Sequence, residues 1–230
     1  MIEYYDWAGG REAMLRFGPA DGPLVVLAPA LFEEANRTRA FAVALLRALA
    51  GHGIASLLPD LPGAGESLSE LEDIAASDWT EAFSAATGTP RCHVAALRGG
   101  CLIAGNVPAL SRWYFAPASG DSVVRDLIRA RQIADREDGR TFDPAELDRE
   151  GPALELAGNR IPRPLLRALR EAEADTMPPC RTVRLESDSR PADRHVAGDP
   201  LWRRSEPAAD PALAALLADD LAAWVRQCAN

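Results

Sequence analysis

The chain contains no lysine, and all 25 of its basic residues are arginines. Without a primary amine on a side chain, the protein can neither form a Schiff base with a substrate nor bind phosphates through a P-loop lysine. It has only three histidines, and none is spaced like the ligands of a zinc site. We therefore expect neither a metal ion nor a cofactor.

Long apolar runs are also missing. No stretch approaches the roughly 18 apolar residues of a membrane span, and the N-terminus lacks the basic and apolar regions of a secretory signal. The four cysteines form no Cys-x-x-Cys pair, which is typical of reduced thiols in the cytosol. These absences predict a cytoplasmic protein. Its formal net charge of -9 disfavours nucleic acid as a partner, because nucleic acids bind to basic surfaces.

Apolar runs of strand length alternate with stretches of helical period along the 230 residues, of which 47% are hydrophobic and 26% are charged. This alternation predicts a mostly parallel central sheet with helices on both faces, in a single domain. The expected strands are residues 12–17, 24–28, 54–58, 93–97, 113–116, 182–185 and 195–197. The expected core helices are residues 37–51, 77–88, 99 to about 108, and 210–227.

Residues 121–179 interrupt this rhythm with two arginine-rich helical stretches, 123–136 and 164–174, joined by polar loops. We expect this segment to form a small helical lid inserted into the domain.

Three loops follow predicted strands, at residues 30–36, 60–67 and 97–100. Because the strands are parallel, we expect the loops to meet at the C-terminal edge of the sheet, where open α/β sheets bind ligands. Asn36, at the end of the first loop, is expected to cap the following helix.

Residues 91–104 have the strand-turn-helix pattern of a nucleophile elbow, and the five central positions read Ala96-Leu97-Arg98-Gly99-Gly100. A G-x-S-x-G elbow presents a nucleophile at its middle position and donates the next backbone N–H to an oxyanion hole. Arg98 occupies that middle position. A guanidinium stays protonated at physiological pH and has no lone pair with which to attack a carbonyl.

Four stretches, residues 29–37, 96–100, 154–166 and 198–202, resemble segments of one branch of the α/β-hydrolase superfamily. That branch comprises hydrolase-like proteins encoded with bacterial exosortase and PEP-CTERM exopolysaccharide loci, in which arginine also occupies the nucleophile position. This chain departs from their pattern at Ala96, where glycine is expected, and at Leu201, where an aromatic residue is more usual. The resemblance implies an α/β-hydrolase fold over essentially the whole chain, and a role linked to exopolysaccharide or protein sorting.

A Ser-His-Asp triad also needs an acid after a later strand and a histidine after the last one. Glu186 and Asp188 follow the predicted strand 182–185, as candidate acids or as solvated loop carboxylates. The loop 198–202 contains no histidine, so the late histidine is His195, which we expect to lie on the strand itself. The standard triad is therefore absent from the expected positions.

A nucleophile could instead have moved to a neighbouring position. Cys101 lies near the start of the elbow helix and close to a cation, both of which lower the pKa of a thiol. Its apolar neighbours instead favour a small buried core residue, which is the commoner fate of such a cysteine. Ser67 and Ser119 also lie at strand ends, without a base that the sequence identifies.

The Arg98 side chain could bind a carboxylate or phosphate in bidentate fashion, or be neutralised internally by Glu33, Glu34 or Glu206. Glu33 and Glu34 occupy the loop that normally supplies the oxyanion hole, where a carboxylate would repel a developing oxyanion. Trp202 could line the pocket or fill the end of the core. The predicted ligand-binding residues are Arg98, Leu97, Gly99, Glu33, Glu34, Asn36, Trp202 and Glu206.

Three functions remain open at this point. The leading hypothesis is a catalytically degenerate hydrolase that binds a small anionic or polar ligand. The second is an esterase, thioesterase or acyl-transfer enzyme whose nucleophile is Cys101 or a loop serine. The third is a structural scaffold in which an ion pair between Arg98 and a glutamate holds the fold together.

Overall fold

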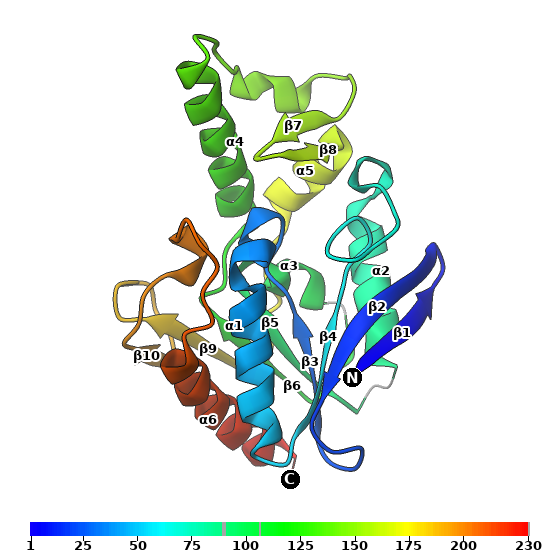
Figure 1. The fold of residues 1–230 in the computed structure, drawn as a ribbon, viewed down its shortest axis with the longest axis vertical. Helices are drawn as coiled ribbons and strands as arrows, with labels where there is room; N and C mark the ends of the chain where they lie inside the picture. Colours follow the sequence, from blue (N-terminus) through cyan, green and yellow to red (C-terminus); the bar gives the residue numbers. More distant parts are fainter. Residues whose placement is uncertain (89–90, 106, 230) are drawn as a thin grey trace.

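An eight-stranded sheet forms the centre of the computed structural model, which describes residues 1–88, 91–105 and 107–229. The strand order is β1-β2-β4-β3-β5-β6-β9-β10, and neighbouring strands from β4 to β10 pair in parallel (Figure 1). Strand β2 is antiparallel to both β1 and β4. The strands are β1 (Ile2–Trp7), β2 (Gly10–Phe17), β3 (Leu24–Ala28), β4 (Ala55–Pro59), β5 (His93–Leu97), β6 (Ser111–Phe115), β9 (Cys180–Leu185) and β10 (Arg194–Val196).

The central strands are apolar on both faces. In β3, Val25 and Leu27 pack into one core cluster, whereas Val26 and Ala28 pack into the other, and all four are fully buried. Successive side chains of a strand point to opposite faces of the sheet. A parallel strand of this composition therefore needs helices on both sides to remove it from water.

Two pairs of helices cover the two faces of the sheet. Helices α1 (Glu33–Ala50) and α6 (Pro211–Cys228) contribute Phe41 and Leu217 to the first core cluster. Helices α2 (Ala76–Thr87) and α3 (Cys101–Ala104) contribute Trp79 and Ile103 to the second. The layered arrangement predicted from the alternation of apolar runs is thus confirmed.

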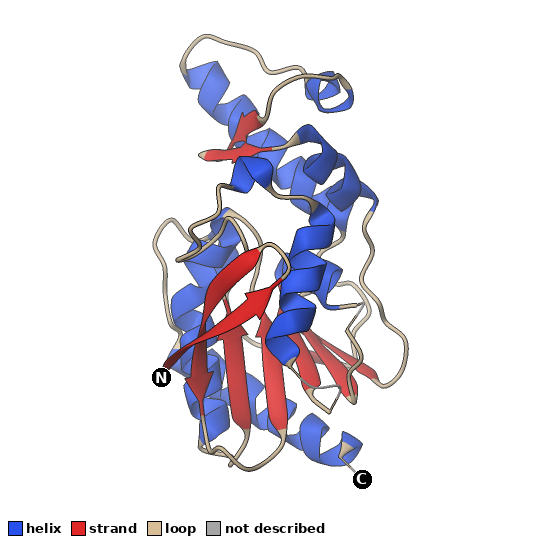
Figure 2. Cartoon of the chain, turned by 90° about the vertical axis from the view of Figure 1, so that its right-hand side faces the viewer, coloured by secondary structure: helices blue, strands red, loops and turns tan. Residues whose placement is uncertain are grey.

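The chain between β6 and β9 forms a cap that stands over the C-terminal edge of the sheet (Figures 1 and 2). It contains helix α4 (Gly120–Glu137), the hairpin β7 (Leu154–Leu156) and β8 (Asn159–Ile161), and helix α5 (Arg163–Glu171). The two cap helices lie where the lid helices were predicted. The hairpin was not predicted, because three-residue strands are too short to display a period of two.

Several predicted boundaries need correction. Helix α1 begins at Glu33 and not at residue 37, so Asn36 lies inside its first turn and does not cap it. The residue before the helix is Phe32, which makes no side-chain cap. The elbow helix α3 ends at Ala104 and is therefore shorter than the predicted stretch from 99 to about 108. Residue 106 of that stretch lies outside the described residues. Strand β1 was not predicted.

None of the helices in the described residues combines the length and the apolar character needed to cross a membrane.

Candidate functional site

Arg98 sits on a sharp turn directly after β5. Its φ of 52° lies in the left-handed region, and Arg98 is the first residue of the 3-10 helix Arg98–Gly100. Gly100 is required here, since a Cβ at this position would lie 2.3 Å from the carbonyl oxygen of Pro29. This close approach packs the turn against the end of β3. The chain therefore builds the strained turn of a nucleophile elbow and places an arginine on it.

The Arg98 guanidinium is enclosed by three groups of the protein, and the residue as a whole is only 7% exposed. Its Nε donates to Glu34 Oε2 over 3.1 Å, and one terminal nitrogen donates to Glu34 Oε1 over 3.0 Å. The other terminal nitrogen donates to the carbonyl oxygen of Ala116 over 3.0 Å. The indole ring of Trp202 covers the guanidinium, with 4.3 Å between the guanidinium carbon and the ring centroid. Arg98 is thus neutralised internally by Glu34.

The Glu34 carboxylate faces opposing influences. Burial raises the pKa of the Glu34 carboxyl above its ordinary value, and the Arg98 guanidinium acts in the opposite direction without restoring it. Asp126, on cap helix α4, raises the pKa of Glu34 further through its negative charge. Arg37 also lowers the pKa of Glu34 through its positive charge, so burial is the main reason why this pKa is raised.

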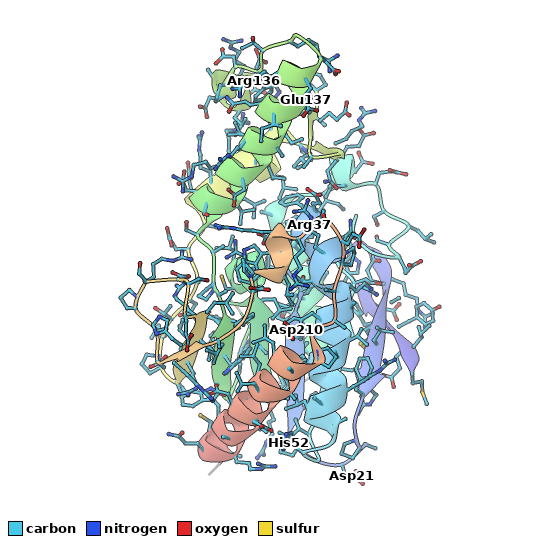
Figure 3. All side chains as sticks on the ribbon, turned by 60° about the vertical axis from the view of Figure 1, so that its left-hand side comes forward. Asp21, Arg37, His52, Arg136, Glu137 and Asp210 are labelled. Carbon is cyan, nitrogen blue, oxygen red and sulfur yellow. The ribbon has the colours of Figure 1, made fainter. Side chains whose placement is uncertain are left out.

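Arg37 forms a second link between the start of α1 and the segment that carries Trp202. Arg37 makes an ion pair with Glu33 one turn earlier on α1 and also donates to the carbonyl oxygen of Trp202 over 3.0 Å. Figure 3 shows Arg37 near the junction between the core and the cap. Glu206 is exposed, and no hydrogen bond joins it to Arg98 in the described part of the chain. Of the three glutamates considered as partners of Arg98, the structure selects Glu34.

A cavity of about 220 Å³ lies beside this ion pair, between the start of α1, the cap helix α4 and the loop that carries Trp202. Its apolar wall includes Phe32, Val123, Leu127 and Trp202. Its charged lining residues are Glu33, Glu34, Arg37, Asp126 and Arg203. Arg98 does not line the cavity, because Glu34 and Trp202 stand in front of it.

The other predicted ligand-binding residues are distributed differently. Leu97 and Asn36 line a separate, enclosed cavity of about 40 Å³ on the far side of Phe32. Gly99 is buried, and a Cβ there would lie 3.1 Å from Val123 of the cap. The structure thus brings Glu33, Glu34 and Trp202 together around one cavity, places Arg98 behind it, and leaves Asn36 outside.

The candidate acid and base do not form a dyad directed at the elbow. Hydrogen bonds from Arg190 hold the pKa of Asp188 well below its usual range, and Arg184 also binds this carboxylate over 3.0 Å. The ring of His195 is exposed and its Nε2 lies 3.1 Å from the carbonyl oxygens of Asp188 and Arg190. The strand β10 carries His195, as expected. This geometry disfavours a catalytic role for either residue.

Each candidate replacement nucleophile is buried or engaged in contacts that stabilise the fold. Cys101 is fully buried, and this burial raises the pKa of its thiol to about 12. The hydroxyl of Ser67 donates to Glu12 over 2.9 Å and accepts from the backbone N–H groups of Gly63 and Ser69, which uses both of its lone pairs. Ser119 caps helix α4. These contacts disfavour the relocated-nucleophile hypothesis.

Sequence reasoning missed three residues of the site. Asp126 carried no signal, because its position depends on how the cap packs over the core. Arg37 could have been found from its spacing of four residues from Glu33, which places both on one face of a helix. Phe32 has φ 55°, and nothing in the sequence marks a phenylalanine for this conformation. The described residues contain no cluster of three possible metal ligands.

No protein-family model and no curated protein matches the chain, but many solved structures resemble it. Est1E from Butyrivibrio proteoclasticus is 14% identical with a TM-score of 0.63, over 99% of this chain and 98% of that one. Alpha/beta hydrolase domain-containing protein 10 from mouse is 16% identical with a TM-score of 0.60, over 96% and 98%. The bottromycin epimerase BotH, solved in complex with bottromycin A2, is 17% identical with a TM-score of 0.55, over 97% and 99%. The chain therefore has the predicted α/β-hydrolase fold.

Proposed function

We propose that this α/β-hydrolase-fold protein binds a small polar ligand in the cavity beside Glu34 and does not carry out Ser-His-Asp catalysis. The observation that supports this proposal is the Arg98–Glu34 ion pair. It joins the nucleophile position to the first turn of α1, where an oxyanion hole would otherwise form, and leaves a cavity of about 220 Å³ next to it. A fold that loses its nucleophile can keep its ligand pocket, because fold and chemistry are separable.

The lining of the cavity favours a ligand with hydrogen-bond donors and an apolar part. Glu34 and Asp126 offer carboxylate oxygens, which only accept hydrogen bonds when ionised. An ammonium group between them would favour the ionised form of Glu34, which burial disfavours and which the charge of Asp126 also opposes. Phe32 and Trp202 provide apolar surface for the rest of such a molecule.

An anionic ligand is the second candidate, because Arg37 and Arg203 also line the cavity. Such a ligand could reach Arg98 only by displacing Glu34, which holds two of its three nitrogens. Because the sequence resembles exosortase-associated proteins, we also propose to test neutral and acidic sugars of the kind found in exopolysaccharides.

The test is a binding screen with probes of one size and different charge: hexylamine, 1-hexanol and hexanoate, with neutral and acidic monosaccharides. A ligand at 100 times its Kd stabilises the fold by about 2.7 kcal/mol, which raises Tm by roughly 5 to 10 °C for a chain of this size. We expect hexylamine to give this shift, Glu34→Gln to reduce it, and the exposed control Glu206→Gln to leave it unchanged. A shift with hexanoate that is lost in Arg98→Met would favour the anionic candidate. No binding by any probe would contradict the proposal.

A further inference from the structure

Phe32 separates the cavity from a second, larger hollow. It lines the 220 Å³ cavity on one side and an open groove of about 470 Å³ on the other. The groove runs between the core loop that contains residues 63–72 and the turn of the cap hairpin β7–β8. Its polar lining residues are Asn36, Ser67, Ser69, Glu70, Glu72, Asn159 and Arg160.

The wall between the two hollows is made of backbone with positive φ on both sides. Phe32 has φ 55° and ψ -133°, a conformation that favours glycine. Opposite it, Ala157 with φ 48° lines the cavity, and Gly158 with φ 76° lines the groove. Two-residue hairpin turns with positive φ at both positions usually begin with asparagine, aspartate or glycine. Backbone strain of this kind concentrates at ligand sites, where the surrounding structure maintains it.

Both sides of the wall are anchored by packing into the second core cluster. The Phe32 ring packs edge-on against Trp79, with 5.4 Å between the ring centroids, and Trp79 is itself anchored by a hydrogen bond to Pro62. The cap hairpin is tied to the core through the ion pair between Arg160 and Glu72, at 2.7 Å. The Arg160 side chain is 68% exposed, so this pair contributes little. Leu156 and Ile161 of the hairpin are fully buried in the second core cluster, so apolar packing and not the ion pair holds this side of the wall.

We propose that the cavity and the groove are two ends of one ligand channel, which takes an elongated molecule across the wall at Phe32. The molecule carries an ammonium or hydroxyl donor at the Glu34 and Asp126 end and an apolar middle part along Phe32. It carries a hydroxyl or amide at the groove end, where Asn36 is exposed and can both donate and accept. This inference rests on the proposed function, because it uses the same Glu34 end of the site.

The test compares a short and a long amino alcohol, 3-amino-1-propanol and 10-amino-1-decanol, by titration calorimetry on the full chain. Each methylene that leaves water strengthens binding by about fourfold, so the long probe should bind at least about tenfold more tightly than the short one. Asn36→Ala should weaken only the long probe, by about fivefold, since it removes one hydrogen bond. Ile133→Ala, an exposed change on the cap outside both hollows, is the matched control and should alter neither affinity.

A kinetic measurement examines the wall itself. In Phe32→Ala, the association rate constant of the long probe should rise by about tenfold, while that of the short probe stays unchanged, because only the long probe passes Phe32. Phe32→Leu serves the same purpose if the alanine variant does not fold. Equal affinities of the two probes, with the short one still dependent on Glu34, would overturn the channel and leave the proposed function intact. If neither probe shows binding that depends on Glu34, both are overturned.

Discussion

Arg98 and Glu34 should be replaced singly and together. We expect the free energy of unfolding to fall when one partner is removed and to change little when apolar residues replace both. Glu34→Leu leaves the guanidinium of Arg98, with a side chain only 8% exposed, without its carboxylate. Breaking a fully buried pair costs about 3 to 5 kcal/mol. Because the Glu34 side chain is 24% exposed, water enters the vacated space, and we expect a loss at the lower limit, about 3 kcal/mol.

Arg98→Met should cost less, about 1 to 2 kcal/mol, and the loss should depend on pH. The Glu34 carboxylate that remains can take up a proton, and its pKa, already raised by burial, rises further without the guanidinium. A raised folded-state pKa contributes stability that is present below the unfolded value of 4.5 and is lost as pH rises through the folded value. Arg98→Met should therefore be more destabilised at about pH 8 than at about pH 5.

The double variant, Glu34→Leu with Arg98→Met, should return to within about 1 kcal/mol of the wild type, since apolar groups often replace buried ion pairs without loss. What remains is the hydrogen bond that the carbonyl oxygen of Ala116 loses. The assay is urea unfolding at constant m, which separates stability from changes in the unfolded state. Additive single effects, or a Glu34→Leu variant as stable as the wild type, would refute the reasoning.

Three further predictions concern other residues. A thiol reagent and a fluorophosphonate should leave Cys101 unmodified in the native protein, because burial raises its pKa to about 12; stoichiometric labelling, read by mass spectrometry, would revive the relocated nucleophile. Asp220 is buried, and although burial opposes it, hydrogen bonds from Arg181, Trp113 and Arg194 lower its pKa to about 2. Its stabilisation is therefore present above the unfolded value of 3.8 and lost as pH falls, so Asp220→Asn should flatten the decrease of Tm between about pH 5 and pH 2. Phe32→Gly should be more stable than Phe32→Ala by about 1 kcal/mol in urea unfolding, because glycine adopts φ 55° without strain; equal stabilities would contradict this account.

The sheet was predictable from local pattern, and the site only in part. Every residue of β3 is apolar, as is every residue of β5 after His93, so both strands and their buried location follow from the run of side chains alone. The elbow was also visible, because Gly99 and Gly100 follow a strand end. The choice of Glu34 over Glu33 was not, since it depends on where α1 begins. That start is set by the unusual backbone of Phe32, and its position four residues before the predicted one turns Glu34 towards Arg98.

For the cap, the sequence predicts the helices but not how they pack over the core. The helical period of α4 is clear in the sequence, yet the period does not say which face lies over the core. The contribution of Asp126 to the charge around Glu34 arises only from that packing. Contacts between segments far apart in the chain are decided by tertiary fit, which single-sequence patterns do not contain.

Arg98, Glu34 and Trp202 occupy the places of the nucleophile, the oxyanion hole and the triad histidine. Together they place a carboxylate where a hydrolase presents hydrogen-bond donors. An oxyanion hole presents N–H groups to a developing negative charge, whereas here Glu34 presents a carboxylate from the first turn of α1, which was predicted to be part of the preceding loop, and Arg98 holds it there. Trp202, in the loop where a triad histidine would lie, covers the guanidinium and so keeps its charge directed at Glu34. Changing Arg98 to serine alone would supply a hydroxyl without a triad histidine and would leave the Glu34 carboxylate unpaired. The elbow turn, the first turn of α1 and the segment that carries Trp202 therefore form one interdependent arrangement, and this supports our proposal of a ligand that donates hydrogen bonds rather than an ester that must accept them.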